Sequence, residues 1–130
     1  MIGMVYLFPG GHVEKGESIV QSVIREIQEE TGLIVSNIVP CGIKDWYDFK
    51  KQKRYIVFFY KTSNYSGKLI SASHEVENKW MTLEEIYINS TAPDFLEMLD
   101  IFTNKNSYTE FFYEDNQNEN EKKRWLKKFY

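Results

Sequence analysis

The feature that most constrains this chain is a carboxylate-rich segment, predicted to be helical, that follows a glycine turn directly. Residues 8–33 read FPGGHVEKGESIVQSVIREIQEETGL. Ser18 and Gln21 have the spacing of a helix capping box, and Gly32 stands where helices commonly end in the left-handed conformation. Apolar residues recur between these caps at helical spacing: Val20, Val23, Ile24 and Ile27. The pattern therefore predicts one amphipathic helix between Ser18 and Gly32.

Three carboxylates crowd the second half of that predicted helix: Glu26, Glu29 and Glu30. At about 100° per residue they share one side of the helix, next to the apolar stripe. Glu26 and Glu30 stand four residues apart and repel one another. A hard cation such as Mg²⁺ would offset this repulsion, because it takes a few carboxylates together with waters and substrate phosphates. A solvated acidic helix face is the alternative interpretation.

The spacing from Gly11 onward resembles the signature of the Nudix hydrolase superfamily. Gly11 is followed by five residues and Glu17, then by seven residues and Arg25-Glu26. Residues 27–33 complete an apolar-x-Glu-Glu-x-Gly-apolar pattern. The resemblance implies an α/β fold, a Nudix-type α/β/α sandwich around a mixed sheet, in a single domain over residues 1–130 with the signature at 11–33. It also implies hydrolysis of a nucleoside diphosphate linked to another moiety.

The same resemblance implies roles for the helix residues. Its metal ligands are Glu26, Glu29 and Glu30, which would bind Mg²⁺, with Mn²⁺ as an alternative ion. Arg25 positions the site, and its place four residues before Glu29 allows an ion pair on the helix surface. The general base differs among relatives, so Glu29 and a glutamate from a later loop are both candidates.

Further candidates lie in the loop before the helix and in a later segment. Gly10 and Gly11 let the backbone approach the helix start closely and are predicted to contact the substrate. Glu17 is predicted to be a structural residue that hydrogen-bonds within its own loop. Glu75 falls in roughly the region where relatives supply an extra metal ligand or base. The alternative for Glu75 is a surface glutamate beside Glu77.

Residues 41–61, CGIKDWYDFKKQKRYIVFFYK, are similar to the MutT-like branch often assigned to oxidised purine nucleoside triphosphates. Asp45 is predicted to accept a hydrogen bond from the edge of a base. Trp46, Tyr47 and Phe49 are predicted to stack on that base. The alternative is that these aromatic side chains fill the core or a dimer interface.

The leading functional hypothesis is Mg²⁺-dependent hydrolysis of a nucleoside triphosphate, such as 8-oxo-dGTP, to a nucleoside monophosphate and pyrophosphate. A second hypothesis keeps the chemistry and changes the substrate to ADP-ribose, a dinucleoside polyphosphate or the 5′ end of RNA. A third is a weakly active domain that binds a nucleotide as a sensor. The complete set of carboxylates favours catalysis, because a pure binder does not require all of them.

The rest of the chain predicts strands interleaved with two short helices, which is typical of a mixed α/β fold. A helix is predicted to begin after Thr82, and a second to cover residues 93–102. The expected strands are 4–8, 33–43 with an interruption near Pro40, 54–62 in the centre of a sheet, 68–70 at an edge, and 76–81. Residues 44–54 are predicted to form a loop or hairpin connection, and residues 63–67, SNYSG, a turn. Residues 108–130 are predicted to form a hairpin.

Composition limits the class of partner. The formal net charge is −3, which argues against a general nucleic-acid binder. The small nucleotide expected as the partner is what the resemblance implies. Cys41 is the only cysteine, which rules out an internal disulfide and a cysteine-based zinc site. The chain carries neither a signal-peptide pattern nor a membrane-span pattern. We therefore expect a cytoplasmic protein with no membrane partner.

The chain also departs from the family pattern. Only eight residues, MIGMVYLF, precede Pro9, whereas relatives usually carry the first sheet strands there. The expectation is that the first strands are missing and that a sheet edge is exposed. An exposed edge invites pairing with another chain. We therefore expect a homodimer, formed either by edge pairing or by strand exchange.

Overall fold

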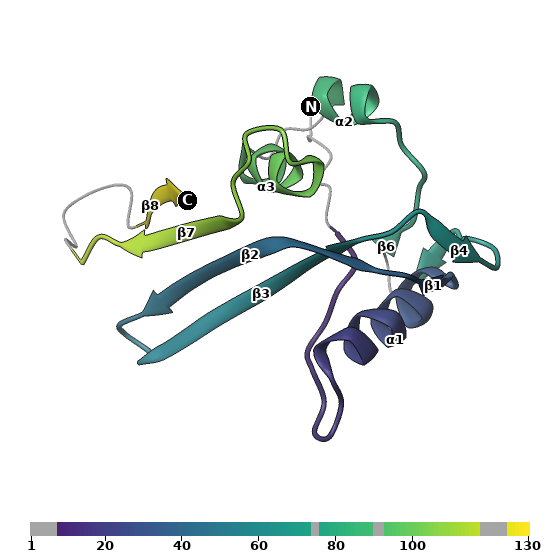
Figure 1. The fold of residues 1–130 in the computed structure, drawn as a ribbon, viewed down its shortest axis with the longest axis horizontal. Helices are drawn as coiled ribbons and strands as arrows, with labels where there is room; N and C mark the ends of the chain where they lie inside the picture. Colours follow the sequence, from purple (N-terminus) through teal and green to yellow (C-terminus); the bar gives the residue numbers. More distant parts are fainter. Residues whose placement is uncertain (1–7, 74–75, 90–92, 118–124) are drawn as a thin grey trace. The chain divides into compact units, whose positions relative to one another are not determined.

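The computed structural model describes residues 8–73, 76–89, 93–117 and 125–130 (Figure 1). The chain divides into two compact units. The first comprises residues 1–39 and 62–96, and the second comprises residues 40–61 and 97–130. Each unit is therefore built from two stretches of chain that are distant in sequence.

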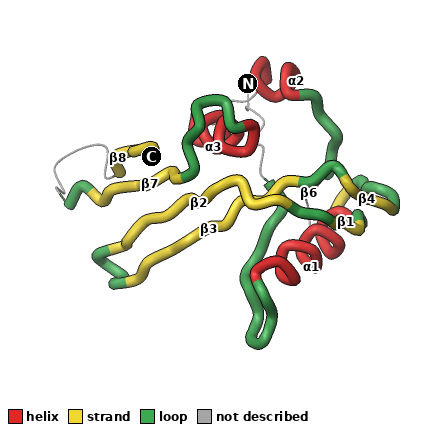
Figure 2. The backbone as a smooth tube through the Cα atoms, in the orientation of Figure 1, coloured by secondary structure: helices red, strands yellow, loops and turns green. Residues whose placement is uncertain are grey.

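The first unit contains the capped helix and short strands. Its elements are α1 (Ile19–Thr31), β1 (Ile34–Ser36), β4 (Asn64–Ser66), β5 (Ala72–Ser73), β6 (Val76–Glu77) and α2 (Leu83–Asn89). β1 pairs with β4, and β5 pairs with β6, both in antiparallel fashion. α1 contacts β1 and β5. Figure 2 shows the loop that leads from residue 8 into the start of α1.

The second unit is organised around one mixed sheet. Its elements are β2 (Val39–Asp48), β3 (Lys53–Lys61), β7 (Glu110–Asp115) and β8 (Trp125–Phe129), and the boundary between the units falls within α3 (Pro93–Thr103). The strand order is β3-β2-β7-β8. β2 and β7 run parallel, whereas β7 and β8 run antiparallel. The predicted mixed α/β architecture is confirmed.

The core of the second unit forms where α3 packs on this sheet. Phe111 on β7 is fully buried, and Ile101 on α3 and Phe59 on β3 are almost so, at 2% and 6% exposure. The ring of Phe111 stacks on that of Phe129, with centroids 4.8 Å apart and planes 7° apart. These contacts join the two outer strands of this sheet, β3 and β8, to one apolar cluster.

The predicted helix ends are confirmed in detail. Ser18 and Gln21 form a capping box, in which the Gln21 backbone N–H donates to Ser18 Oγ and the Ser18 N–H donates to the Gln21 side chain. Gly32 ends α1 with a φ of 77°, in the left-handed region that glycine tolerates. Thr82 accepts from the Glu85 N–H at 3.1 Å at the start of α2. The helix predicted over residues 93–102 is α3.

The predicted C-terminal hairpin is also confirmed, because β7 and β8 pair in register from Phe111 with Phe129 to Asp115 with Trp125. The prediction of a connection over residues 44–54 was wrong in part. Residues 44–48 continue β2, so only residues 49–52 connect it to β3. The interruption predicted near Pro40 is present at residues 37–38, between β1 and β2, and Pro40 itself is the second residue of β2, near a strand end where its missing N–H is tolerated.

Other strand predictions need correction. β3 stands at the end of the strand order among the described residues, and its apolar residues Ile56 and Phe58 stay 47% and 43% exposed. The predicted turn at 63–67 contains the strand β4, because residues 64–66 pair with β1. Residues 68–70 form no strand, because the Ile70 N–H donates to the end of α1 instead. The strand predicted over 76–81 is limited to β6.

The first predicted strand, over residues 4–8, falls almost wholly outside the described residues. Phe8, its last residue, stacks on Phe95 with ring centroids 4.4 Å apart. Over the part of the chain that the structure describes, no helix combines the length and the apolar character needed to cross a membrane.

Candidate active site

The glycine loop is tied back onto α1 by backbone groups. The Gly10 N–H donates to Glu30 Oε2 at 3.1 Å, near the end of the helix. The His12 carbonyl accepts from Arg25 Nη2 at 3.1 Å and from Ser22 Oγ at 3.4 Å. These bonds place the loop along the side of the helix that carries the predicted metal ligands.

Arg25 is the centre of this arrangement, because all five of its N–H groups have acceptors. Glu17 receives two of them, from Nε at 2.7 Å and from Nη2 at 2.9 Å. Nη1 donates to Glu26 at 2.6 Å and to Glu29 at 3.2 Å. The remaining N–H of Nη2 reaches the His12 carbonyl. Arg25 therefore fixes one loop carboxylate and two helix carboxylates at once.

The electrostatics follow from these contacts. The Arg25 hydrogen bonds, together with the N–H of Glu14 at 3.1 Å, lower the pKa of Glu17 to about 2. Glu17 and then Glu26 raise the pKa of Arg25 in return. Both groups therefore stay charged across the pH range of ordinary enzymes. The predicted loop hydrogen bond of Glu17 and the predicted ion pair of Arg25 with Glu29 are present.

Gly11 is the point of closest approach between loop and helix. A Cβ added at Gly11 would fall within 3.0 Å of the Glu26 carboxylate, a separation that real Cβ atoms do not show. Gly10 differs, because a Cβ there would meet nothing within 4 Å. The sequence therefore needs glycine at position 11 so that the Glu26 carboxylate can lie against the backbone.

The three carboxylates predicted as metal ligands are held by separate donors in this structure. Among the described residues, no group of three or more His, Cys, Asp or Glu side chains is arranged to hold a metal ion. Glu26 and Glu29 turn toward Arg25, and Glu30 turns toward the Gly10 N–H. The physical reason is their mutual repulsion, which these donors relieve.

The donor set nevertheless fits a divalent cation. Glu26, Glu29 and Glu30 are each held through one carboxylate oxygen. Carboxylates are the ligands that Mg²⁺ prefers, and that ion usually completes its shell with waters and substrate phosphates. The Glu26 carboxylate occupies the space that a Cβ at Gly11 would fill, so a negative group lies against the loop backbone. The three residues are therefore suitable ligands for Mg²⁺ or Mn²⁺.

The residues predicted to read the base belong to the second unit and do not share one face of β2. Successive side chains of a strand point to opposite faces. Trp46 stacks on Tyr55 with centroids 4.9 Å apart, whereas Tyr47 meets Phe49 edge-on at 4.8 Å. Asp45 lies on the same face as Tyr47 by this alternation. A single pocket formed by Asp45, Trp46 and Tyr47 together is therefore not available.

Asp45 has an unusual environment for a carboxylate. It is 7% exposed, and its Oδ2 accepts from Arg54 Nη1 at 3.0 Å, while its buried Oδ1 has no hydrogen-bond donor among the described residues. Burial, and then the neighbouring Asp45, raise the pKa of Glu110 on the adjacent strand. Sequence reasoning missed Arg54 and Glu110, because no spacing rule links them to Asp45.

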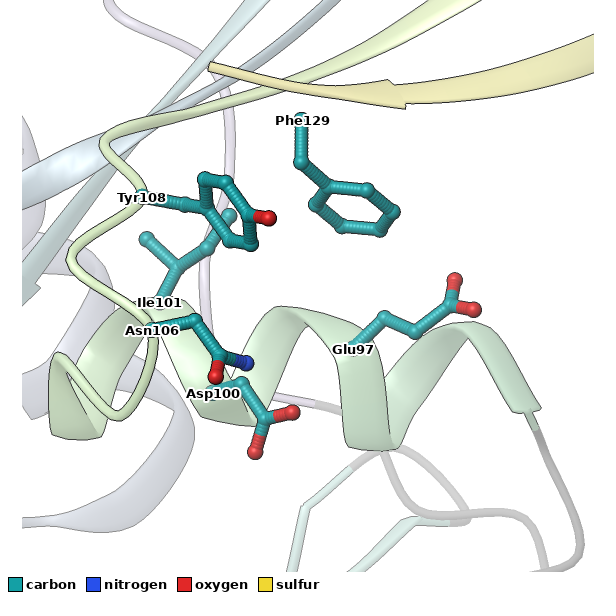
Figure 3. A pocket seen from close by; sticks show the side chains of 6 residues that line it. All are labelled: Glu97, Asp100, Ile101, Asn106, Tyr108 and Phe129. Carbon is teal, nitrogen blue, oxygen red and sulfur yellow. The ribbon is translucent and has the colours of Figure 1, made fainter.

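A shallow cavity of about 180 Å³ lies elsewhere in the second unit (Figure 3). Glu97 and Asp100 extend from α3 on one side of it, and the rings of Tyr108 and Phe129 lie on the other (Figure 3). The cavity is lined by Glu97, Asp100, Ile101, Asn106, Tyr108 and Phe129. It contains none of the residues that the sequence predicted for the site.

Two more contacts concern predicted site residues. Glu75, the later glutamate, lies outside the described residues. Asn78, which sequence reasoning did not single out, donates from Nδ2 to the Glu30 carbonyl at 2.7 Å. No sequence signal marks such a bond, because it joins residues 48 positions apart and uses a main-chain acceptor.

Comparison with known proteins agrees with this site. The chain is 33% identical over 100 residues to the uncharacterized Nudix hydrolase YvcI of Bacillus subtilis, covering 73% of this chain and 62% of that protein. It is 31% identical over 83 residues to the NAD-capped RNA hydrolase NudC of Pseudomonas aeruginosa, covering 63% of this chain and 28% of that protein. The chain thus spans less than two thirds of the length of either relative.

A solved structure and a family model support the same relationship. The crystal structure of a mutator MutT protein from Bacillus halodurans superposes with a TM-score of 0.66 at 26% identity, covering 85% of this chain and 74% of that one. The model of the NUDIX domain matches residues 3–101, which include the glycine loop and the whole of α1. The chain is therefore a member of the Nudix family.

Proposed function

We propose that this chain hydrolyses a nucleoside triphosphate to a nucleoside monophosphate and pyrophosphate, with Mg²⁺ as the metal and Mn²⁺ as an alternative. The observation that carries the proposal is the Arg25 network, which joins Glu17 of the loop to Glu26 and Glu29 of the helix. Similarity to a MutT protein of known structure supports 8-oxo-dGTP as the leading substrate.

In this proposal Glu26, Glu29 and Glu30 are the metal ligands. A bound divalent cation supplies a water of lowered pKa and neutralises charge on the phosphates. Arg25 keeps two of the ligands in place and offsets their repulsion. Glu29 is a candidate general base, and it is the most exposed of the carboxylates that Arg25 contacts on the helix, with 59% of its side chain accessible. Glu75 is the second candidate.

A different substrate class has specific support. The relative NudC is named for NAD-capped RNA, in which a pyrophosphate joins two nucleosides. Such a substrate, like ADP-ribose or a dinucleoside polyphosphate, needs the same metal ligands and a different recognition surface. A weakly active nucleotide sensor is the remaining alternative.

The first experiment measures turnover of a substrate panel with Mg²⁺ by chromatography of the products. The panel contains 8-oxo-dGTP, dGTP, ADP-ribose, diadenosine tetraphosphate and NAD. Glu29→Gln tests the site, because the amide keeps the size of the side chain and an oxygen that can accept from Arg25. Glu84→Gln on α2 is the matched control for a surface glutamate.

The outcomes separate the hypotheses. Release of pyrophosphate from 8-oxo-dGTP, lost in Glu29→Gln and kept in Glu84→Gln, is the expected result. Release of nucleoside monophosphates from NAD or diadenosine tetraphosphate alone would retain the chemistry and replace the substrate. Absence of turnover across the panel by a folded protein that binds Mg²⁺ would favour the sensor.

A further inference from the structure

The C-terminal turn of α1 carries two predicted metal ligands, and a side chain from a distant segment holds it. Asn78 donates from Nδ2 to the Glu30 carbonyl at 2.7 Å and to the Ile70 carbonyl at 3.0 Å. Its backbone N–H donates to the Ser71 carbonyl at 3.0 Å. Both side-chain partners are carbonyl oxygens, so only the NH₂ group of the amide satisfies them.

The surrounding backbone is in close contact with the same turn. The last carbonyls of a helix lack partners within the helix. The Ile70 N–H donates to the Thr31 carbonyl at 2.9 Å. A Cβ at Gly32 would fall 2.8 Å from the Lys68 carbonyl oxygen, so only glycine permits this approach. Residues 68–71 and Asn78 therefore close the end of α1, and Asn78 supplies the side-chain part of that closure.

Glu30 is consequently held from two directions. Its carboxylate accepts from the Gly10 N–H at 3.1 Å, and its main-chain carbonyl accepts from Asn78 at 2.7 Å. The first bond comes from the loop before the helix, and the second comes from the segment after β6. Rotation or fraying of the last turn would break the second bond and displace the carboxylate.

We propose that Asn78 is a positioning residue for the metal site, which holds the last turn of α1 in the place from which Glu29 and Glu30 would bind a divalent cation. The inference rests on the proposed function, because it takes these glutamates to be ligands. Groups that orient metal ligands typically change metal affinity by about 10- to 100-fold when they are removed.

The experiment measures Mn²⁺ binding to the whole chain by electron paramagnetic resonance, without substrate, for wild type, Asn78→Ala and Asn78→Asp. The control is Asn89→Ala, which removes the same kind of bond, from an asparagine amide to the Glu85 carbonyl at 2.8 Å, on α2. Asn78→Ala is expected to raise the Mn²⁺ dissociation constant about tenfold or more. Asn78→Asp is expected to raise it further, because its oxygens face two carbonyl oxygens.

A second measurement separates positioning from a general loss of structure. The Mg²⁺ dependence of turnover on the best panel substrate is compared between wild type and Asn78→Ala. A positioning role raises the Mg²⁺ concentration for half-maximal rate, and saturating Mg²⁺ restores most of the rate. A merely structural role lowers the rate at every Mg²⁺ concentration and leaves the half-maximal concentration unchanged, which would overturn the proposal.

The remaining outcomes are also decisive. Unchanged Mn²⁺ affinity in a folded Asn78→Ala protein would overturn the inference and leave the proposed function intact. Absence of Mn²⁺ binding by the wild type would overturn both. Where both variants fail to fold, amide hydrogen exchange of the wild type decides. Mg²⁺ binding to the wild type should then slow the exchange of the Ile70 and Gly32 amides. Equal exchange rates with and without Mg²⁺ would overturn the inference.

Discussion

Gly11→Ala is the most informative single change, because it acts on the site and spares the core. The new methyl group would fall within 3.0 Å of the Glu26 carboxyl carbon. That carbon must retreat by about 1 Å to reach the 3.4 Å at which ordinary contact begins. The displaced atoms are the far end of a flexible side chain, so the fold can adjust, while the Glu26 carboxylate, a proposed metal ligand, cannot stay in place.

A misplacement of about 1 Å at a reacting centre can reduce turnover by about 100-fold. We therefore expect kcat/KM of Gly11→Ala to fall by about 100-fold, which equals about 2.7 kcal/mol of transition-state stabilisation. The assay is release of product from the best panel substrate at saturating Mg²⁺, together with the midpoint of thermal unfolding. We expect that midpoint to stay close to the wild-type value.

Gly10→Ala is the matched comparison, because its methyl group meets nothing within 4 Å and its N–H still reaches Glu30. Its loss of kcat/KM is expected to stay below about tenfold, the equivalent of about 1.4 kcal/mol. Equal losses in the two variants would refute the reasoning, and so would near wild-type turnover in Gly11→Ala. The first result would point to loop flexibility, and the second would remove Glu26 from the site.

Two further predictions concern stability. Arg25 lowers the pKa of Glu17 to about 2, so the folded state binds a proton at Glu17 less readily than the unfolded state does. The resulting stabilisation is present above pH 4.5 and is lost as the pH falls toward 2. Glu17→Gln should therefore flatten the dependence of unfolding free energy on pH across that window, and an unchanged slope in urea titrations would contradict the pairing. Phe111→Ala should reduce the free energy of unfolding by about 3–5 kcal/mol, because the side chain is fully buried. Ile88→Ala, at a residue 72% exposed, should change it by less than about 0.5 kcal/mol, and similar effects of the two changes in urea unfolding would contradict the assigned core.

Local sequence signals predicted the ends of α1 and one contact of Arg25. Ser18, Gln21 and Gly32 mark the ends of α1 through bonds that involve only near neighbours in sequence, and these bonds are present. The partnership of Arg25 with Glu29 followed from their spacing of four residues. Glu17 was recognised as a loop residue, but spacing did not reveal that Arg25 would take both of its oxygens.

Non-local contacts account for most of what the sequence did not predict. The apolar content of β3 indicated burial but not the identity of its neighbours, so its place at the end of the strand order was missed. The pairing of β1 with β4 converted a predicted turn into a strand. Asn78 lay within the strand predicted over 76–81 and was not singled out, because its acceptor is a main-chain carbonyl with no sequence signature. The predicted homodimer and the predicted roles of Asp45 and Glu75 stay predictions.

The parallel pairing of β2 with β7 has a consequence for how the protein reaches its native state. Ile43 is in register with Glu110, so the centre of the sheet joins strands separated in sequence by about half of the chain. Closing such a long loop opposes folding entropically, and folding rates fall as contacts become more distant in sequence. The β7–β8 hairpin can form locally, but Phe59 and Phe111 meet only after β2 and β7 have joined. We therefore expect the association of β2 with β7 to limit the folding rate, and the newly synthesised chain to expose its apolar strands until β7 has emerged.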